Sequence, residues 1–206
     1  MTNPWEHIPL SDYENHMRLD SVRQLQNLNQ MMKEQFDTYP ASSVMILGIA
    51  GGNGLEHIYK HNFQKVYGVD INESYLRAVE QRYGDISALC CVRCNLIKEA
   101  NKLPKSELLI ANLLIEYIGY ECFQRVLRQT QARYVSCVIQ SNANGGFISQ
   151  SPYMPTFAKL DRVHHSIEEK GLIEALESAK YKLIAQRDNP LPNGKKLVRL
   201  DFQYEC

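Results

Sequence analysis

The stretch VMILGIAGGNG, residues 44–54, decides the fold class of this chain. It begins as a short apolar run and ends in glycines, which is typical of a buried parallel strand that enters a tight turn. A second apolar run, VYGVD at residues 66–70, follows and ends in an acid. Because residues 55–60 between the two runs predict a helix, the chain starts an α/β unit of two parallel strands.

The alternation of strand and helix patterns continues to residue 179. Further strands are predicted at residues 66–71, 89–92, 108–111 and 134–140. Further helices are predicted at residues 73–83, 120–128 and 166–179, the last of them opened by a capping box from Ser166 to Glu169.

The end of the chain breaks this alternation. Two strand-like segments, residues 181–187 and 197–204, are joined without a helix and should therefore be antiparallel. In the second segment apolar residues alternate with Arg199, Asp201 and Gln203, which predicts a strand with one wetter face. We predict a three-layer, doubly wound α/β fold, with a mostly parallel seven-stranded sheet that ends in an antiparallel hairpin.

The first part of the chain has a helical pattern. Apolar residues recur at steps of three and four from Val22 to Phe36, and Pro40 ends this amphipathic helix. We therefore predict two parts, a helical lid or extension at residues 1–40 and the main domain at residues 41–206.

The amino-acid composition indicates the cellular location of the protein and the classes of partner that it can bind. Lys and Arg together number 23, as do Asp and Glu, so the chain has no net field that attracts nucleic acid or anionic membranes. No apolar run reaches the roughly 20 residues of a membrane helix, and no signal peptide is recognisable. We expect a cytoplasmic protein without nucleic-acid or membrane partners; an oligomer is compatible with the sequence.

Cysteine spacing gives little support for a metal site. Of the six cysteines, Cys91 and Cys94 form a C-x-x-C pair. A zinc site needs further ligands, and no second Cys or His pair stands at a helpful spacing. We expect reduced thiols and no bound metal.

The glycine-rich turn and the acid predict a ligand site. In such sheets ligands bind beyond the carboxyl ends of the strands. The glycines let backbone N–H groups approach a ligand, and Asp70 is placed to accept hydrogen bonds from both hydroxyls of a ribose. A dinucleotide is disfavoured because the G-x-G-x-x-G fingerprint, begun at Gly52, meets His57 at its third glycine.

Residues 44–54 and 66–72 together resemble the first two motifs of class I S-adenosylmethionine (SAM)-dependent methyltransferases, which are Rossmann-like enzymes. The resemblance covers about residues 44–204 and implies SAM as the cofactor. It departs from the family at Gly48, where an acid usually helps to hold the methionine end, and at Asn95, where aspartate is commoner. The resemblance implies cofactor-binding roles for Gly48, Ala50, Gly52, Asn53, Gly54, Asp70, Ile71, Asn95, Leu96 and Asn112.

The sequence indicates less about the methyl acceptor than about the cofactor. Leu113 and Leu114 stand where enzymes that methylate exocyclic amines of bases or glutamine have prolines, which favours a small-molecule acceptor. The candidate catalytic residues are Tyr13, His16, Glu116 and Tyr117. For each of these a packing role remains an alternative. His164 and His165 are secondary candidates, with the same alternative.

Three functions stay open at this point. The leading one is a small-molecule methyltransferase that acts on an unidentified oxygen, nitrogen or sulfur atom. The alternatives are an NAD-dependent oxidoreductase and a methyltransferase-like protein that binds cofactor without catalysis. The loop at residues 141–160 is long enough to help to close a pocket.

Overall fold

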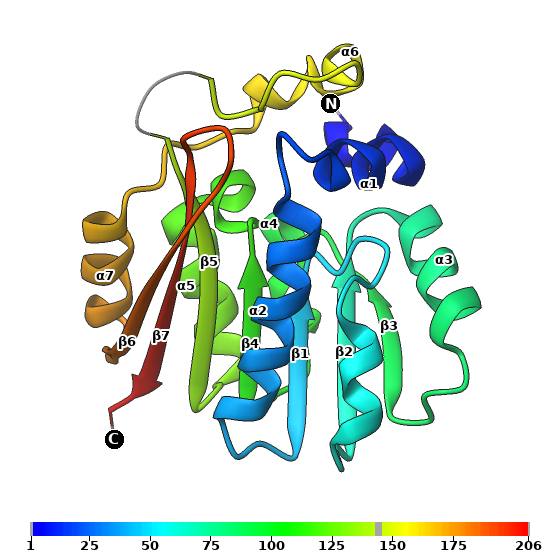
Figure 1. Ribbon diagram of the computed structural model, residues 1–206. Coiled ribbons are helices and arrows are strands. Elements are labelled where there is room, and N and C mark those ends of the chain that lie inside the picture. Colours follow the sequence, from blue (N-terminus) through cyan, green and yellow to red (C-terminus); the bar gives the residue numbers. More distant parts are fainter. Residues whose placement is uncertain (1, 143–145, 206) are drawn as a thin grey trace.

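A computed structural model describes residues 2–142 and 146–205 of the chain. Seven strands form one sheet in the order β3-β2-β1-β4-β5-β7-β6 (Figure 1). The first five strands are mutually parallel: β1 (Ser43–Leu47), β2 (Lys65–Asp70), β3 (Leu89–Arg93), β4 (Leu108–Asn112) and β5 (Tyr134–Ser141). The chain ends in an antiparallel hairpin of β6 (Tyr181–Pro190) and β7 (Lys196–Tyr204), and β7 pairs with β5. The predicted fold is therefore confirmed.

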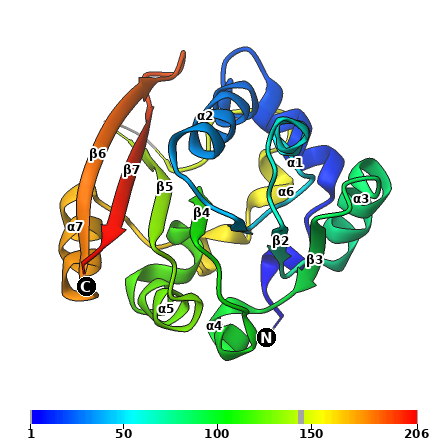
Figure 2. The ribbon, with the colours of Figure 1, turned by 90° about the horizontal axis from the view of Figure 1, so that it is seen from below.

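Helices cover both faces of the sheet, as Figure 2 shows along the strands. One face packs against α4 (Leu96–Glu99), α5 (Ile115–Thr130) and α7 (Glu169–Ser178). The other packs against α2 (Gln24–Thr38), the 3-10 helix η2 (Leu55–Lys60) and α3 (Glu73–Tyr83). In β1, Met45 and Leu47 belong to the first apolar core and Val44 and Ile46 to the second, which explains why this strand is apolar throughout.

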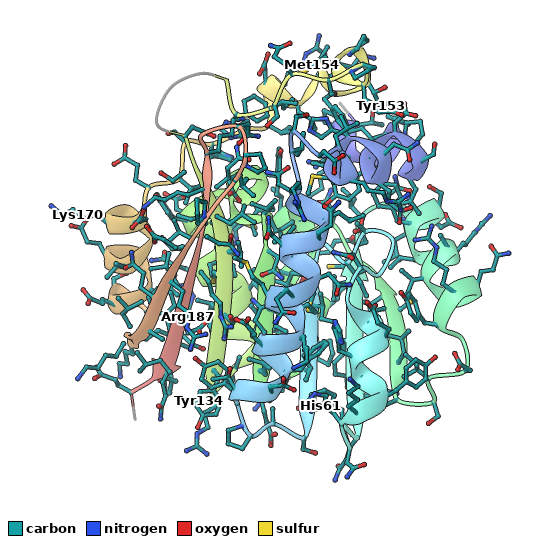
Figure 3. All side chains as sticks on the ribbon, in the orientation of Figure 1. His61, Tyr134, Tyr153, Met154, Lys170 and Arg187 are labelled. Carbon is teal, nitrogen blue, oxygen red and sulfur yellow. The ribbon has the colours of Figure 1, made fainter. Side chains whose placement is uncertain are left out.

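The remaining helical segments gather at the carboxyl ends of the parallel strands (Figure 1). They include η1 (Pro4–His7) and α1 (Leu10–Arg18) from the N-terminus, and α6 (Met154–Phe157) with η4 (Leu160–Arg162) from the loop after β5. A further short turn, η3 (Ala100–Lys102), follows α4. Figure 3 shows Tyr153 and Met154 at this end of the molecule, and His61 and Tyr134 at the opposite end.

Two local predictions are wrong. Helix α7 starts at Glu169 after an N-cap residue, Glu168, whose side chain makes no capping bond, so the capping box from Ser166 does not form. Ile167 is buried in the core instead, and the Glu168 backbone N–H donates to the Tyr120 hydroxyl at 3.0 Å. Tertiary packing of Ile167 thus holds residues 164–168 out of the helix.

The predicted wetter face of the last strand is also wrong. Arg199 and Asp201 are only 2% and 3% exposed, because α2 covers this face. The two side chains neutralise each other through a contact of 2.7 Å between Arg199 Nη2 and Asp201 Oδ2. The period-two pattern therefore comes from a buried ion pair between two strand neighbours on the same face.

Two features are absent from the described part of the chain. None of its helices combines the length and the apolar character needed to cross a bilayer. No group of three or more His, Cys, Asp or Glu side chains in residues 2–142 and 146–205 is arranged to hold a metal ion.

Candidate active site

The loop at residues 48–54 carries β1 into η2 with an unusual backbone. Gly48, Ala50, Gly52 and Gly54 all have positive φ, at 66°, 48°, 80° and 90°. Alanine is strained in this left-handed region, which costs on the order of 1 kcal/mol. The strain is held in place by Asp70, because its Oδ2 accepts a hydrogen bond from the Ala50 backbone N–H at 3.0 Å.

The last two glycines have a packing role. A Cβ atom on Gly52 would lie 2.8 Å from the ring of Tyr83, and one on Gly54 would lie 2.7 Å from Met32. These glycines let the loop pack closely against α3 and α2. They lie outside the cleft described next.

A cleft lies at the carboxyl ends of β1, β2 and β4. We call it the strand-end cleft. Seven of the ten predicted cofactor-binding residues line it: Gly48, Ala50, Asp70, Ile71, Asn95, Leu96 and Asn112. The structure thus brings together residues from four separate segments of the chain.

Asp70 is the charged side chain of this cleft. Its Oδ1 accepts from the Asn72 backbone N–H at 2.9 Å, in addition to the contact with Ala50. Burial raises the pKa of Asp70, and the backbone hydrogen bonds oppose that shift by favouring the carboxylate. Since a carboxylate oxygen has two lone pairs, each oxygen retains one for a ligand hydroxyl.

The three asparagines predicted at this site have different structural roles. Asn53 does not reach the cleft; its Nδ2 donates to the Leu25 carbonyl at 2.9 Å and ties the loop to α2. Asn95 caps α4, because its Oδ1 accepts from the Ile97 N–H at 3.1 Å. Asn112 shares two hydrogen bonds with the Gln35 amide, at 2.9 and 3.0 Å.

A second cavity, the side chamber, adjoins the strand-end cleft. The four residues that line both cavities are Trp5, Tyr13, Leu113 and Tyr117. Trp5 packs edge-on against the other two aromatic rings, with centroid distances of 5.8 Å to Tyr13 and 4.9 Å to Tyr117. These shared residues place the two cavities next to each other.

Residues 3–18, the N-terminal arm, are fixed over both cavities by polar contacts. Asn72 Nδ2 donates to the Trp5 carbonyl at 2.9 Å, two residues beyond Asp70. Arg82 of α3 contacts both the arm and the glycine loop, because its Nη2 donates to Glu14 at 3.0 Å and its Nη1 to the Gly51 carbonyl at 2.9 Å.

All four predicted catalytic residues line the side chamber: Tyr13, His16, Glu116 and Tyr117. Burial raises the pKa values of the Tyr13 and Tyr117 phenols. Burial, followed by the nearby Lys195 charge, lowers the pKa of His16, whose Nδ1 lies 2.8 Å from Ser151 Oγ. The two phenols and the imidazole therefore stay neutral at pH 7.

Glu116 has one satisfied and one unsatisfied carboxyl oxygen. Its Oε1 accepts from the Gln140 backbone N–H at 2.9 Å, whereas its Oε2 is buried without a hydrogen-bond partner among the described residues. The side chain is only 6% exposed, and burial raises its pKa to about 7. An unsatisfied buried oxygen costs about 1–3 kcal/mol. Glu116 lines both the side chamber and a further hollow, which Ser166 and Lys170 also line.

Two more unsatisfied polar atoms border the cavities and were not predicted from sequence. Trp5 Nε1 and the Tyr75 hydroxyl are buried and lack partners within residues 2–142 and 146–205. Tyr75 lies on the apolar face of α3, so its pattern indicates only core packing. His164, a secondary candidate, does reach the side chamber and stacks on Phe147 at 3.8 Å.

Comparisons with known proteins give matches to solved structures only. No family model matches the chain, and no curated protein matches it by sequence. One similar structure is magnesium protoporphyrin IX methyltransferase (ChlM) from Synechocystis PCC 6803 with bound S-adenosylhomocysteine (SAH). It superposes with a TM-score of 0.65 at 10% identity, over 94% of this chain and 87% of that one. N-methyltransferase NodS from Bradyrhizobium japonicum WM9, in complex with SAH, has a TM-score of 0.65 at 11% identity. That match covers 96% of this chain and 98% of the other.

A third similar structure belongs to a protein of different activity. The [4+2]-cyclase SpnF has a TM-score of 0.65 at 8% identity, and the match covers 91% of this chain and 84% of that one. At these identities the likenesses establish the fold, which is the Rossmann-like fold of class I SAM-dependent methyltransferases. The reaction has to be argued from the site itself.

Proposed function

We propose that the protein is a SAM-dependent methyltransferase that acts on a small molecule. One observation carries this proposal: the strand-end cleft, with Asp70 and the glycine loop, shares four lining residues with a side chamber that the buried acid Glu116 also lines. Methyl transfer needs a donor site and an acceptor site that meet at one point. The two adjoining cavities supply this arrangement.

The residues of the strand-end cleft fit SAM. Asp70 would hold the ribose hydroxyls, the Gly48–Ala50 backbone would face the methionine end, and Ile71, Asn95 and Leu96 would enclose the adenine. The unsatisfied Tyr75 hydroxyl and Trp5 Nε1 offer further polar contacts. When bound, SAM supplies a methyl group made electrophilic by the positive sulfur.

The chain's own residues would align the acceptor and exclude water. The N-terminal arm covers both cavities, so we assign the lid role to residues 3–18, while α2 forms part of the layer on the sheet. Tyr13 and Tyr117 would position the acceptor as neutral hydrogen-bonding groups where the two cavities adjoin. Among the four predicted catalytic residues, Glu116 is the acid whose pKa, about 7, suits proton transfer at neutral pH.

Calorimetric titration tests the cofactor assignment directly. We expect SAM and SAH to bind at micromolar concentrations and NAD to give no heat of binding, because the loop lacks the dinucleotide fingerprint. NAD binding in place of SAM would favour the oxidoreductase alternative. If SAM binds but a broad panel of small molecules yields no methylated product, the non-catalytic alternative is favoured.

The lid assignment predicts a moderate effect of Arg82→Gln. This change removes the contacts from α3 to Glu14 and Gly51. Exposed ion pairs contribute up to about 1 kcal/mol, so SAH affinity should fall about two- to fivefold, through faster dissociation measured by stopped-flow. Arg77→Gln is the matched control, because Arg77 pairs only with Glu73 of the same helix. Equal dissociation rates in both variants would contradict the lid role.

A further inference from the structure

We propose that the methyl acceptor is a primary or secondary amine, which Glu116 binds and deprotonates through Oε2. This inference rests on the proposed function and adds the chemical class of the acceptor. It is carried by the charge and the wall chemistry of the side chamber and by the unsatisfied oxygen of Glu116.

The charge of the side chamber selects against anions. Glu116 is the single acidic residue among the described residues that line it, and none of these is Lys or Arg. His16 and His164 also line it, and burial lowers the pKa of each, so both are neutral at pH 7. The nearest cation is Lys195, which lies behind this lining and donates to the Phe147 carbonyl at 2.9 Å. The charge on the lining itself is therefore that of Glu116, and an ammonium group would neutralise it.

The walls of the side chamber favour the same class of acceptor. Aromatic rings line it from three parts of the chain: the N-terminal arm, α5 and the loop after β5. The rings are those of Trp5, Tyr13, Tyr117, Phe147 and Phe157. Ring faces attract cations and also enclose an apolar skeleton, so an amine on an apolar or aromatic body suits this chamber.

Burial moves the pKa of an amine toward that of Glu116, whereas it moves the pKa of a hydroxyl away from it. Desolvation disfavours the charged form, which lowers the pKa of an ammonium group and raises that of a phenol. The protein's own side chains show both effects here. Lys195 donates to the carbonyl of chamber residue Phe147 at 2.9 Å, and burial lowers the pKa of its amine to about 8. Burial raises the pKa of the Tyr117 phenol. A carboxylate with a pKa of about 7 can therefore deprotonate a buried amine more readily than a buried phenol.

The proton and electron balance is complete with SAM as the co-reactant. The acceptor enters as R–NH3⁺ and gives one proton to Glu116 Oε2, which leaves a lone pair on nitrogen. The lone pair forms the new N–C bond to the methyl group as the C–S bond breaks, and the electron pair of that bond stays on sulfur. The products are the N-methylammonium ion, SAH and a protonated Glu116 that returns its proton to solvent.

The test measures ligand binding to the SAH-saturated protein by calorimetry. The probes are three isosteres of different charge: benzylamine, benzyl alcohol and benzoate. We expect benzylamine to bind at least about tenfold more tightly than benzyl alcohol, and benzoate not to bind. Glu116→Gln should abolish this preference without a change in SAH affinity. Glu121→Gln, an exposed position on the same helix, is the matched control and should keep it.

A second readout follows the charge of Glu116 in the complex that precedes methyl transfer. Without a methyl donor, benzylamine should remain an ammonium ion that stabilises the Glu116 carboxylate. In infrared difference spectra at pH 7 it should therefore remove the band of a protonated carboxyl group in the wild type and in Glu121→Gln, but not in Glu116→Gln. Equal binding of amine and alcohol, a preference that survives Glu116→Gln, or absence of amine binding would each overturn the amine assignment. Normal SAH binding in that case would leave the proposed function intact, whereas failure to bind SAM and SAH would refute the proposed function itself.

Discussion

Asp70→Asn is expected to weaken SAH binding by about 100-fold or more. Each hydrogen bond to a charged group contributes about 1.5–3 kcal/mol, and the carboxylate is placed to accept one from each ribose hydroxyl. Asparagine keeps the size of the side chain but has one acceptor oxygen. Calorimetric titration of both proteins with SAH gives the change in Kd directly.

The same substitution also disturbs the loop, so the ribose contact needs its own control. Asp70 holds the Ala50 and Asn72 backbone N–H groups, and asparagine can accept from only one of them. A 2′,3′-dideoxy analogue of SAH separates the two effects. The wild type should prefer SAH to this analogue by at least about tenfold, and the variant should bind both alike. If the variant retains the wild-type preference, Asp70 does not bind the ribose.

The fold could be predicted because its signals are local and repeated. The run from Val44 to Leu47 is apolar at every position because the strand is buried on both faces, and the short link to the last strand permits only a hairpin. Arg199 and Asp201 were misplaced for a different reason. Their burial depends on α2, which comes from a distant part of the chain, and a period-two pattern does not show what covers each face.

In the strand-end cleft, the residues that could be predicted from sequence are those at or just after the end of a strand. Gly48, Ala50, Asp70 and Asn112 reach the strand-end cleft because parallel strands end at one edge of the sheet. Trp5 reaches it through contacts across the fold, and no spacing in the sequence records that its carbonyl meets Asn72.

Buried polar contacts connect this site to β7 on the face of the sheet that α2 covers. Gln35 Nε2 donates to Asn112 and also to Ser136 Oγ, both at 2.9 Å, and Ser136 in turn donates to Asp201. A chain of hydrogen bonds thus runs from the wall of the strand-end cleft to the ion pair on β7. Asp201 anchors it by also accepting from the Tyr39 hydroxyl at 2.8 Å.

Asp201→Ala should accordingly lower the free energy of unfolding by about 3–5 kcal/mol, the usual cost of breaking a buried ion pair from one side. The change leaves the Arg199 guanidinium, 2% exposed, without its bidentate partner, and it removes the acceptor of Ser136 and Tyr39. Urea denaturation followed by circular dichroism measures the effect. Asp188→Ala is the matched control, because Asp188 pairs with Lys196 on the exposed part of the same hairpin and should change stability by at most about 1 kcal/mol.

The double variant Arg199→Met/Asp201→Leu distinguishes an unpaired charge from lost volume. In Asp201→Ala the Arg199 guanidinium keeps one carboxylate contact among the described residues, at 3.6 Å from Glu34 Oε2. If the main cost is this poorly paired guanidinium, replacing Arg199 and Asp201 with apolar side chains of similar size should recover more than half of the lost stability. The recovery would be incomplete, because Ser136 and Tyr39 still lack their acceptor. A double variant as unstable as Asp201→Ala would assign the loss to the hydrogen bonds of Ser136 and Tyr39 and not to the guanidinium.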